Sequence, residues 1–221
     1  MKKTLFAFVY TLCISFYGNS QLTEGHISYS IDVSTDNPEM QSVIGMFNDS
    51  KMEVYFSKDK TRSEMNMGVV MNITTISDIQ SDSILMLMGG ITGQNAVKMT
   101  ISEMIKEIDS TNFKVTLLPE TKDILNYKCK KAKVSDSDGN ESVYWYTNEI
   151  NVSKQGQTYL NSAVPGFPME FELNNRGVKL AIIVSKLDKK IDVKKRPSLF
   201  SLNIPTNYNL ISKEDLLNMG M

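Results

Sequence analysis

Short segments in which apolar and polar residues alternate recur along this chain, and they restrict its fold more than any other feature. In residues 26–33 the alternation places one side of the segment in a core, which is the pattern of a half-buried strand. Residues 51–67 contain two such runs around a polar turn at residues 58–60, which predicts a hairpin. Further strands are predicted at residues 69–79, 83–88, 113–118, 127–134, 142–147, 167–173 and 178–186.

Nine to eleven predicted strands, arranged mostly as successive hairpins, place the chain in the mainly β class with a minor α component. We expect a single curved antiparallel sheet that forms an open half-barrel with a few covering helices. One covering helix is expected within residues 91–111, where Ile101 and Met104 belong to an apolar stripe at helical spacing. A short final helix is expected after Ser212, because Asp215 follows it three residues later, as in a capping box.

Residues 1–20 have the features of a cleavable export signal. Positive charges at Lys2 and Lys3 precede an apolar stretch, residues 4–16, that is too short to cross a bilayer, and small residues then form a cleavage site. We therefore expect this segment to be a signal peptide and residues 21–221 to form a single domain. The protein is expected to be exported to the periplasm or to the extracellular space.

The charge of the chain argues against nucleic acid as a partner. The sequence holds 24 basic and 25 acidic residues, and it has no basic tail and no basic stripe with interleaved aromatic residues. After residue 20, no segment approaches the roughly 18 uninterrupted apolar residues of a membrane-spanning helix, so the exported part is not expected to span a membrane. The partners that we expect are a lipid or another apolar ligand, or an envelope protein.

Residues that carry catalysis or bind metals are sparse. His26 is the only histidine and lies at the start of the first predicted strand, a poor setting for a catalytic base. Cys129 is the only cysteine after residue 20, so zinc lacks its usual ligands, and we interpret this cysteine as a small buried hydrophobe. Glu170 and Glu172 alternate with apolar residues, as outward-facing residues of a strand do. We therefore expect no enzyme, no catalytic residue, no metal site and no cofactor.

Methionine is the most informative bias in composition, with 14 in the chain. Many of them lie between residues 65 and 104, in predicted strands and in the predicted helix. Flexible thioethers suit a surface that repacks around variable apolar partners, but they also fill irregular cores, so an apolar cavity and a packed core are both open interpretations. Methionine pairs at residues 65 and 67 and at residues 86 and 88 have the spacing of Cu(I) ligands, but no histidine or cysteine accompanies them, which disfavours copper.

Five phrases spread over the exported part are informative when they are taken together. They are Gly25-His26-Ile27-Ser28-Tyr29, ILNYKCKKA at residues 124–132, VYWYT at residues 143–147, PGFPME at residues 165–170, and SLF at residues 198–200 with IPTNY at residues 204–208. In this order and spacing they resemble secreted proteins of Gram-negative envelopes, namely the GLPGLI-type group and the wider lipoprotein-carrier (LolA/LolB-like) superfamily. The resemblance implies a curved antiparallel half-barrel whose concave apolar face, closed by helices, holds acyl chains. We interpret Trp145 as a core residue.

Together these features predict an exported binding protein that holds a hydrophobic ligand, an acyl chain or a lipid, in the half-barrel beneath residues 91–111. The alternative is a non-enzymatic structural or interaction protein of the envelope with a filled core. The predicted ligand-binding residues are Met65, Met67, Met71, Ile84, Met86, Met88, Met99, Ile101, Met104 and Ile108.

Overall fold

The computed structural model describes residues 22–91, 93–109, 113–137, 139–150, 164–175 and 177–218. The strands are β1 (Glu24–Thr35), β2 (Lys51–Ser57), β3 (Lys60–Met67), β4 (Met71–Asp78), β5 (Ser83–Gly90), β6 (Asn95–Met99), β7 (Lys114–Ile124), β8 (Tyr127–Ser135), β9 (Glu141–Thr147), β10 (Phe167–Asn175), β11 (Val178–Asp188) and β12 (Asn209–Leu210). The helical elements are α1 (Pro38–Gln41), η1 (Ile44–Phe47), α2 (Ile101–Asp109), η3 (Val193–Lys195) and α3 (Lys213–Asn218). None of the helices in these ranges is long and apolar enough to cross a membrane.

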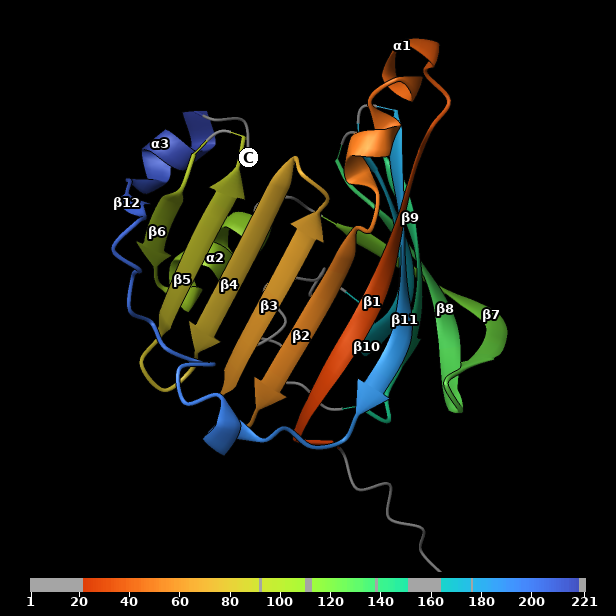
Figure 1. Cartoon of the computed structure of the whole chain (residues 1–221). Coiled ribbons are helices and arrows are strands. Elements are labelled where there is room, and N and C mark those ends of the chain that lie inside the picture. The colour runs from red at the N-terminus through yellow and green to blue at the C-terminus, as the bar shows by residue number, and fades with distance from the viewer. Residues whose placement is uncertain are drawn as a thin grey trace, which may run out of the picture.

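All twelve strands belong to one sheet, in the order β12-β6-β5-β4-β3-β2-β1-β11-β10-β9-β8-β7. Most neighbouring strands are consecutive antiparallel hairpins (Figure 1), whereas β1 joins two distant parts of the chain by pairing with β2 and with β11. Among these strands only β12 and β6 pair in parallel. The sheet is open, with β12 and β7 at its edges. The prediction of a mainly β chain with one antiparallel sheet and few helices is confirmed.

The main core lies on one face of the sheet, which we call the inner face. Ile27 and Tyr29 of β1 are buried there at alternate positions, as the sequence pattern predicts. Farther along the sheet, Phe171 of β10 stacks on Tyr144 of β9 with the ring centroids 5.4 Å apart. The buried hydroxyl of Tyr29 donates to the Pro168 carbonyl oxygen at 3.0 Å, so this phenol enters the core without losing its hydrogen bond.

The region expected to form one covering helix divides into a strand and a helix. Residues 95–99 form β6, which pairs with β5 along its whole length, and α2 begins only at Ile101. In Figure 1, α2 lies behind β4 and β5, on the side of the inner face. Two strands, β6 and β12, were not predicted; they have five and two residues, too few for alternation to be recognised.

The opposite face, which we call the outer face, is covered over β4–β6 by part of the segment between β11 and α3, residues 189–212, which we call the C-terminal segment. The residues of this second core are Ile76, Leu85, Leu87 and Ala96 of the sheet and Leu202, Ile204 and Tyr208 of the segment. The segment leaves β11 and runs along the ends of β1, β2 and β3 before it reaches β4–β6, so it leaves much of the outer face of these strands uncovered (Figure 1).

Two local predictions are confirmed at single residues. The Ser212 hydroxyl accepts from the Asp215 backbone N–H at 3.1 Å, and the Asp215 carboxylate accepts from the Ser212 N–H at 3.1 Å, which is the reciprocal capping box of α3. Cys129 of β8 is fully buried, and burial raises the pKa of its thiol to about 11. It is therefore a small buried hydrophobe. The polar composition of residues 151–164 predicts a connecting loop, but residues 151–163 lie outside the described residues.

Candidate functional site

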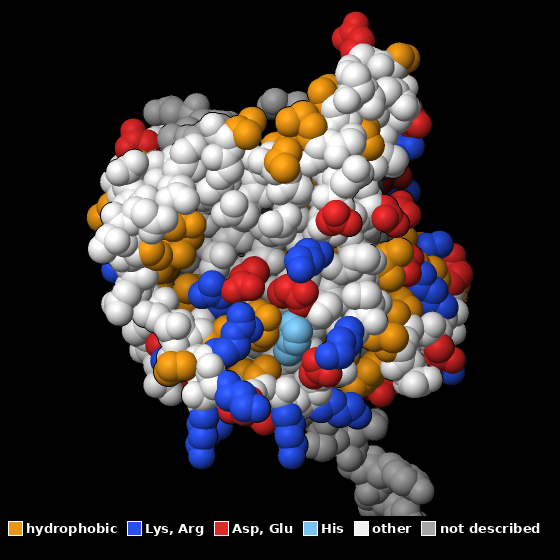
Figure 2. Space-filling model, in the orientation of Figure 1, with side chains coloured by type: hydrophobic (Ala, Val, Ile, Leu, Met, Phe, Trp, Pro, Cys, Tyr) orange, Lys and Arg blue, Asp and Glu red, His pale blue; other side chains and the backbone are white. Residues whose placement is uncertain are grey.

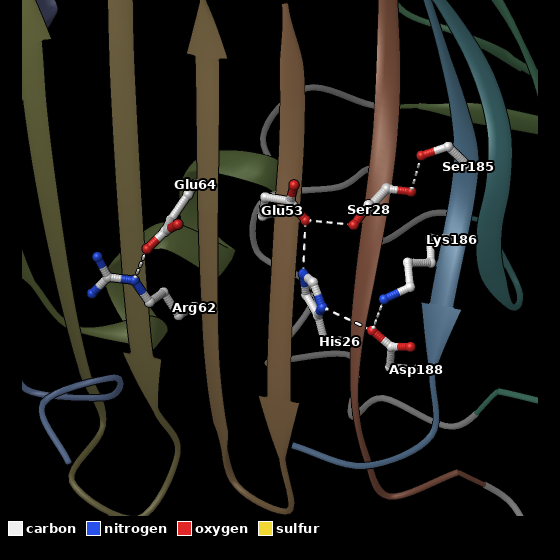
Figure 3. A network of polar contacts seen from close by, with 8 residues as sticks. All are labelled: His26, Ser28, Glu53, Arg62, Glu64, Ser185, Lys186 and Asp188. Carbon is white, nitrogen blue, oxygen red and sulfur yellow. Dashed lines mark hydrogen bonds and ion pairs between the residues drawn. The ribbon is translucent and has the colours of Figure 1, made fainter. Parts of the chain in front are cut away.

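The open part of the outer face carries a band of charged and polar side chains. Alternate residues of a strand face opposite ways, so burial of Ile27 and Val54 on the inner face places His26, Ser28 and Glu53 on the outer face. Figure 2 shows the histidine surrounded by basic and acidic side chains on this face. We call the residues drawn in Figure 3 the His26 network: His26, Ser28, Glu53, Arg62, Glu64, Ser185, Lys186 and Asp188.

His26 is the centre of this network (Figure 3). Its Nε2 lies 2.7 Å from Glu53 Oε2 of β2, and its Nδ1 lies 3.3 Å from Asp188 Oδ2 of β11. The imidazole also stacks on the Tyr55 ring, with centroids 4.3 Å apart and planes 3° apart. Ser28 donates to the same Glu53 oxygen at 2.6 Å. Because β1 lies between β2 and β11, one imidazole links strands from opposite ends of the sequence.

Opposite charges are paired through the network. Lys186 donates to Asp188 at 2.7 Å, and this ammonium holds the pKa of the Asp188 carboxyl below its usual value. Glu64 of β3 lies directly opposite Glu53 in the register of the sheet, and like charges in that position repel one another. Arg62 forms an ion pair with Glu64. Adjacent cations therefore keep these carboxylates close together on one face.

The C-terminal segment borders the His26 network on one side. In addition to its ion pair with Glu64, Arg62 donates a hydrogen bond to the Leu199 carbonyl oxygen at 3.3 Å. The Arg196 guanidinium lies 4.7 Å from the centroid of the Tyr55 ring, at a distance typical of a cation–π contact. The segment that covers β4–β6 is thus fastened to the strands that carry the network.

The geometry favours recognition over nucleophilic chemistry. The Ser28 hydroxyl donates to Glu53 and not to His26, so a serine–histidine nucleophile is not assembled here. Both nitrogens of His26 face carboxylates. In the described part of the chain, no group of three or more His, Cys, Asp and Glu side chains is arranged to hold a metal ion. The network instead presents several donors and acceptors at fixed positions, which suits a ligand with many hydroxyl or amide groups.

The predicted ligand-binding residues lie on a different part of the molecule, and the structure brings three of them together. Met65, Met86 and Met104 line a cavity of about 160 Å³ on the inner face, which is smaller than the roughly 300–1,000 Å³ of typical small-molecule sites. Of the others, Met67, Ile84, Met88 and Ile101 are buried, Met71 and Met99 are partly buried against the core, and the side chain of Ile108 lies outside the described residues. A role for these residues in ligand binding stays a prediction.

Trp145 differs from its interpretation as a core residue. Tyr144 and Tyr146 are buried on the inner face, so Trp145 between them faces outward and is only partly buried. Lys122 lies with its Nζ 4.4 Å from the centre of the indole ring. Glu170 and Glu172, in contrast, were predicted to face outward, and the burial of Phe171 between them confirms this.

His26 was predicted to lie at the start of the first strand, in a poor setting for a catalytic base. The structure confirms this position, since β1 begins at Glu24, but β1 is an interior strand and His26 therefore has neighbouring strands on both sides. A signal was present in the outward alternation of His26 and Ser28. The partners of His26, which are Glu53 and Asp188, lie on β2 and β11. The alternation of apolar and polar residues does not determine which strands pair with β1.

Comparison with protein families gives a match over most of the chain. The family model described as N-glycanase peptide, N-terminal domain, matches residues 27–205. The chain belongs to this family. The matched range begins in β1 and ends in the segment that precedes β12, so the N-glycanase N-terminal domain family shares nearly the whole sheet described above. A search of curated proteins finds no match.

Solved structures of the protein PNGF-II are similar to this chain. The structure in space group P21 superposes with a TM-score of 0.50 at 17% identity and covers 89% of this chain. The structure in space group C2 gives a TM-score of 0.49 at 16% identity, also over 89% of this chain. This chain covers 33% and 32% of those two structures, so it spans about a third of their length.

These comparisons overturn the predicted family and function. The GLPGLI-type and LolA/LolB-like assignment is wrong, because the matching family is the N-glycanase N-terminal domain. A LolA superfamily protein from Nitrosomonas europaea reaches a TM-score of only 0.22 at 8% identity, over 79% of this chain and 89% of that chain, and gives the assignment no support. The predicted carrier of an acyl chain or lipid, and its alternative of an envelope structural protein, are wrong for the same reason. The prediction of a non-enzyme is contradicted as well, because the family is one of N-glycanases.

Proposed function

We propose that this chain takes part in the enzymatic release of N-linked glycans, and that it holds the glycan-bearing substrate on the outer face of its sheet. The match of the N-glycanase N-terminal domain family to residues 27–205 carries the proposal. Because the chain spans about a third of the length of PNGF-II, we assign to it the binding of substrate. The substrate of an N-glycanase joins a sugar chain to a polypeptide, so its binding surface must satisfy many hydroxyl and amide groups.

The chemistry of the His26 network supports this role. Carboxylates of Glu53, Glu64 and Asp188 accept hydrogen bonds, and Arg62 and Lys186 donate them, all on one face of neighbouring strands. Sugar hydroxyls both donate and accept, so an alternation of acids and bases matches them. The side chains of His26, Glu53 and Arg62 are only 20%, 22% and 20% exposed, which means that little side-chain freedom remains to be lost on binding.

Isothermal titration of residues 21–221 with an N-glycopeptide, and with the same peptide lacking its glycan, tests the proposal. We expect the glycopeptide to bind at least about tenfold more tightly, which corresponds to about 1.4 kcal/mol. Glu53→Gln removes the charge that faces His26 and is expected to weaken binding of the glycopeptide, whereas Glu39→Gln in the exposed α1 serves as a matched control. Equal affinity for the two peptides would contradict the proposal.

The setting of the protein is part of the same proposal. We propose that residues 1–20 are removed on export, that residues 21–221 form one working domain, and that this domain acts in the periplasm or outside the cell. We also propose that its open sheet curves as a half-barrel, with the His26 network on the convex side. Mass spectrometry of the protein recovered from the envelope and the medium tests the first point, and recovery of a chain that retains residues 1–20 would refute it.

A further inference from the structure

A polar groove lies on the outer face farther along β1 and β11, where these strands neighbour β10 and β9. Its volume is about 360 Å³, within the roughly 300–1,000 Å³ of small-molecule sites. Its polar lining comes from Ser34, Glu141, Glu172, Asn174 and Lys179, with apolar residues of β10 and β11 between them. The register of the sheet sets Asn174 and Ser34 on either side of Lys179. The groove thus crosses four neighbouring strands.

Trp145 lies on the same face as this groove. It is four residues from Glu141 on β9, so both side chains point outward, about 13 Å apart at the usual rise of a strand. On the neighbouring strand, Glu170 lies directly opposite Trp145, and Glu172 is the next outward residue toward the groove. An aromatic ring and a polar groove therefore belong to one continuous strip, which we call the Trp145 strip.

Part of the polar lining is available to a ligand. The side chains of Glu172 and Asn174 are exposed, and within the described part of the chain neither makes a hydrogen bond. A carboxylate accepts hydrogen bonds, and an amide both accepts and donates them. Neighbouring sugar hydroxyls, or a hydroxyl and an acetamido group, present the complementary donors and acceptors.

The charged side chains on and around the Trp145 strip do not favour an acidic ligand. Each of its lysines is paired with a carboxylate: Lys122 with Glu170, Lys131 with Glu120, Lys133 with Glu141, and Lys179 with Asp36. Glu172 adds one more carboxylate near Lys179, and the Asp36 carboxylate, with a smaller part from Glu172, raises the pKa of that ammonium. The strip therefore has no surplus of positive charge to attract a sialic acid or a sulfate.

We infer that the Trp145 strip binds the sugar part of the substrate and that it selects neutral pyranoses over sialylated ones, an inference that rests on the proposed function. In the complex the C–H face of one pyranose packs on the indole of Trp145, and the hydroxyls of the next residues reach Glu172 and Asn174. Lys122 and Lys131 lie 4.4 and 5.5 Å from the centre of the ring. Both lysine side chains are partly buried, 34% and 26% exposed, and each pairs with a carboxylate, so the pyranose packs on the indole by displacing an ammonium from the ring.

Titration calorimetry with three ligands tests this inference: a high-mannose N-glycopeptide, a disialylated biantennary N-glycopeptide, and the same peptide without a glycan. We expect residues 21–221 to bind the high-mannose form most tightly. Trp145→Ala is expected to weaken that binding at least about fivefold. Glu172→Gln keeps the shape of the groove, so it is expected to weaken the neutral glycan by a few fold and to improve the sialylated one. Gln80→Ala, in an exposed turn between β4 and β5, is the matched control.

The outcomes separate this inference from the proposed function. If the protein prefers the neutral glycopeptide, and Trp145→Ala and Glu172→Gln weaken it while Gln80→Ala does not, the inference holds. If the glycopeptide binds but both strip variants bind as the unchanged protein does, the inference is overturned and the proposed function stands. If the sialylated glycopeptide binds more tightly than the high-mannose form, the inference that the strip selects neutral sugars is overturned. If neither glycopeptide binds better than the bare peptide, the proposed function fails, and the inference fails with it.

Discussion

Replacement of His26 by alanine is the perturbation that most directly probes the His26 network. The change removes two contacts to carboxylates, at 2.7 Å and 3.3 Å, and the stacking of the imidazole on Tyr55. Asp188 keeps Lys186 as a partner, and Glu53 keeps Ser28. The protein is therefore expected to fold with a network that is weakened at its centre.

The expected loss of stability follows from these contacts. The two contacts between the imidazole and partly exposed carboxylates contribute about 0.5–1 kcal/mol each. The stacked pair of rings adds about 0.5–1.5 kcal/mol. We therefore expect the free energy of unfolding to fall by about 2 kcal/mol, which in a chain of this size lowers Tm by roughly 4–8 °C. His26→Phe keeps a ring over Tyr55 and loses only the polar contacts, so its expected loss is smaller, about 1 kcal/mol.

Urea denaturation monitored by circular dichroism measures these changes. Lys195→Ala is the control, because it breaks an ion pair to Asp192 whose side chains are 83% and 52% exposed, and such pairs contribute less than about 0.5 kcal/mol. A loss of less than about 0.5 kcal/mol for His26→Ala, or an equal loss for Lys195→Ala, would refute the view that His26 organises this face.

Three further predictions concern single residues away from this network. Burial raises the folded-state pKa of Cys129 from 9.0 to about 11, so the stability linked to this thiol is complete below pH 9 and is lost as pH rises toward 11. Urea titrations at several pH values should therefore show that the free energy of unfolding falls less steeply between pH 9 and 11 in Cys129→Ala than in the unchanged protein. An equal fall in the two proteins would contradict this prediction. Ser212→Ala removes the cap of α3 and is expected to speed amide exchange there by an amount equivalent to about 1 kcal/mol, and unchanged exchange would argue against the cap. Gly68→Ala should lower the free energy of unfolding by at least about 1 kcal/mol, because Gly68 has φ +60° and a Cβ would lie 2.0 Å from the Met46 carbonyl oxygen. Gly45 has open space around it, so Gly45→Ala is the control and should change stability little. Similar losses of stability in the two variants would refute the steric argument.

Much of the sheet was predictable because its order is local. Residues 51–67 form β2 and β3 as expected, since alternation and a polar turn at their centre act over a few residues. The capping box at Ser212 is local in the same way. β12 was not predictable, because its two residues are ordered by parallel pairing with β6, more than a hundred residues earlier.

The candidate site depends on pairings that the sequence pattern does not contain. His26 and Asp188 are 162 residues apart, and alternation shows only that each faces outward. The methionine bias has an equally limited meaning, because packing alone decides that Met65, Met86 and Met104 border a cavity while Met67 is buried in the core. The resemblance to lipoprotein carriers rested on turns and core positions, which mark a curved sheet and not its function.

The most direct test of the account is the binding of residues 21–221 to an N-glycoprotein, compared with the same polypeptide produced without its glycan. Surface plasmon resonance with each form immobilised at equal density gives the two affinities under one set of conditions. We predict concentration-dependent, saturable binding to the glycosylated form and at least about tenfold weaker binding to the bare polypeptide. Equal binding to both surfaces, or binding to neither, would contradict the claim that this chain holds the glycan-bearing substrate.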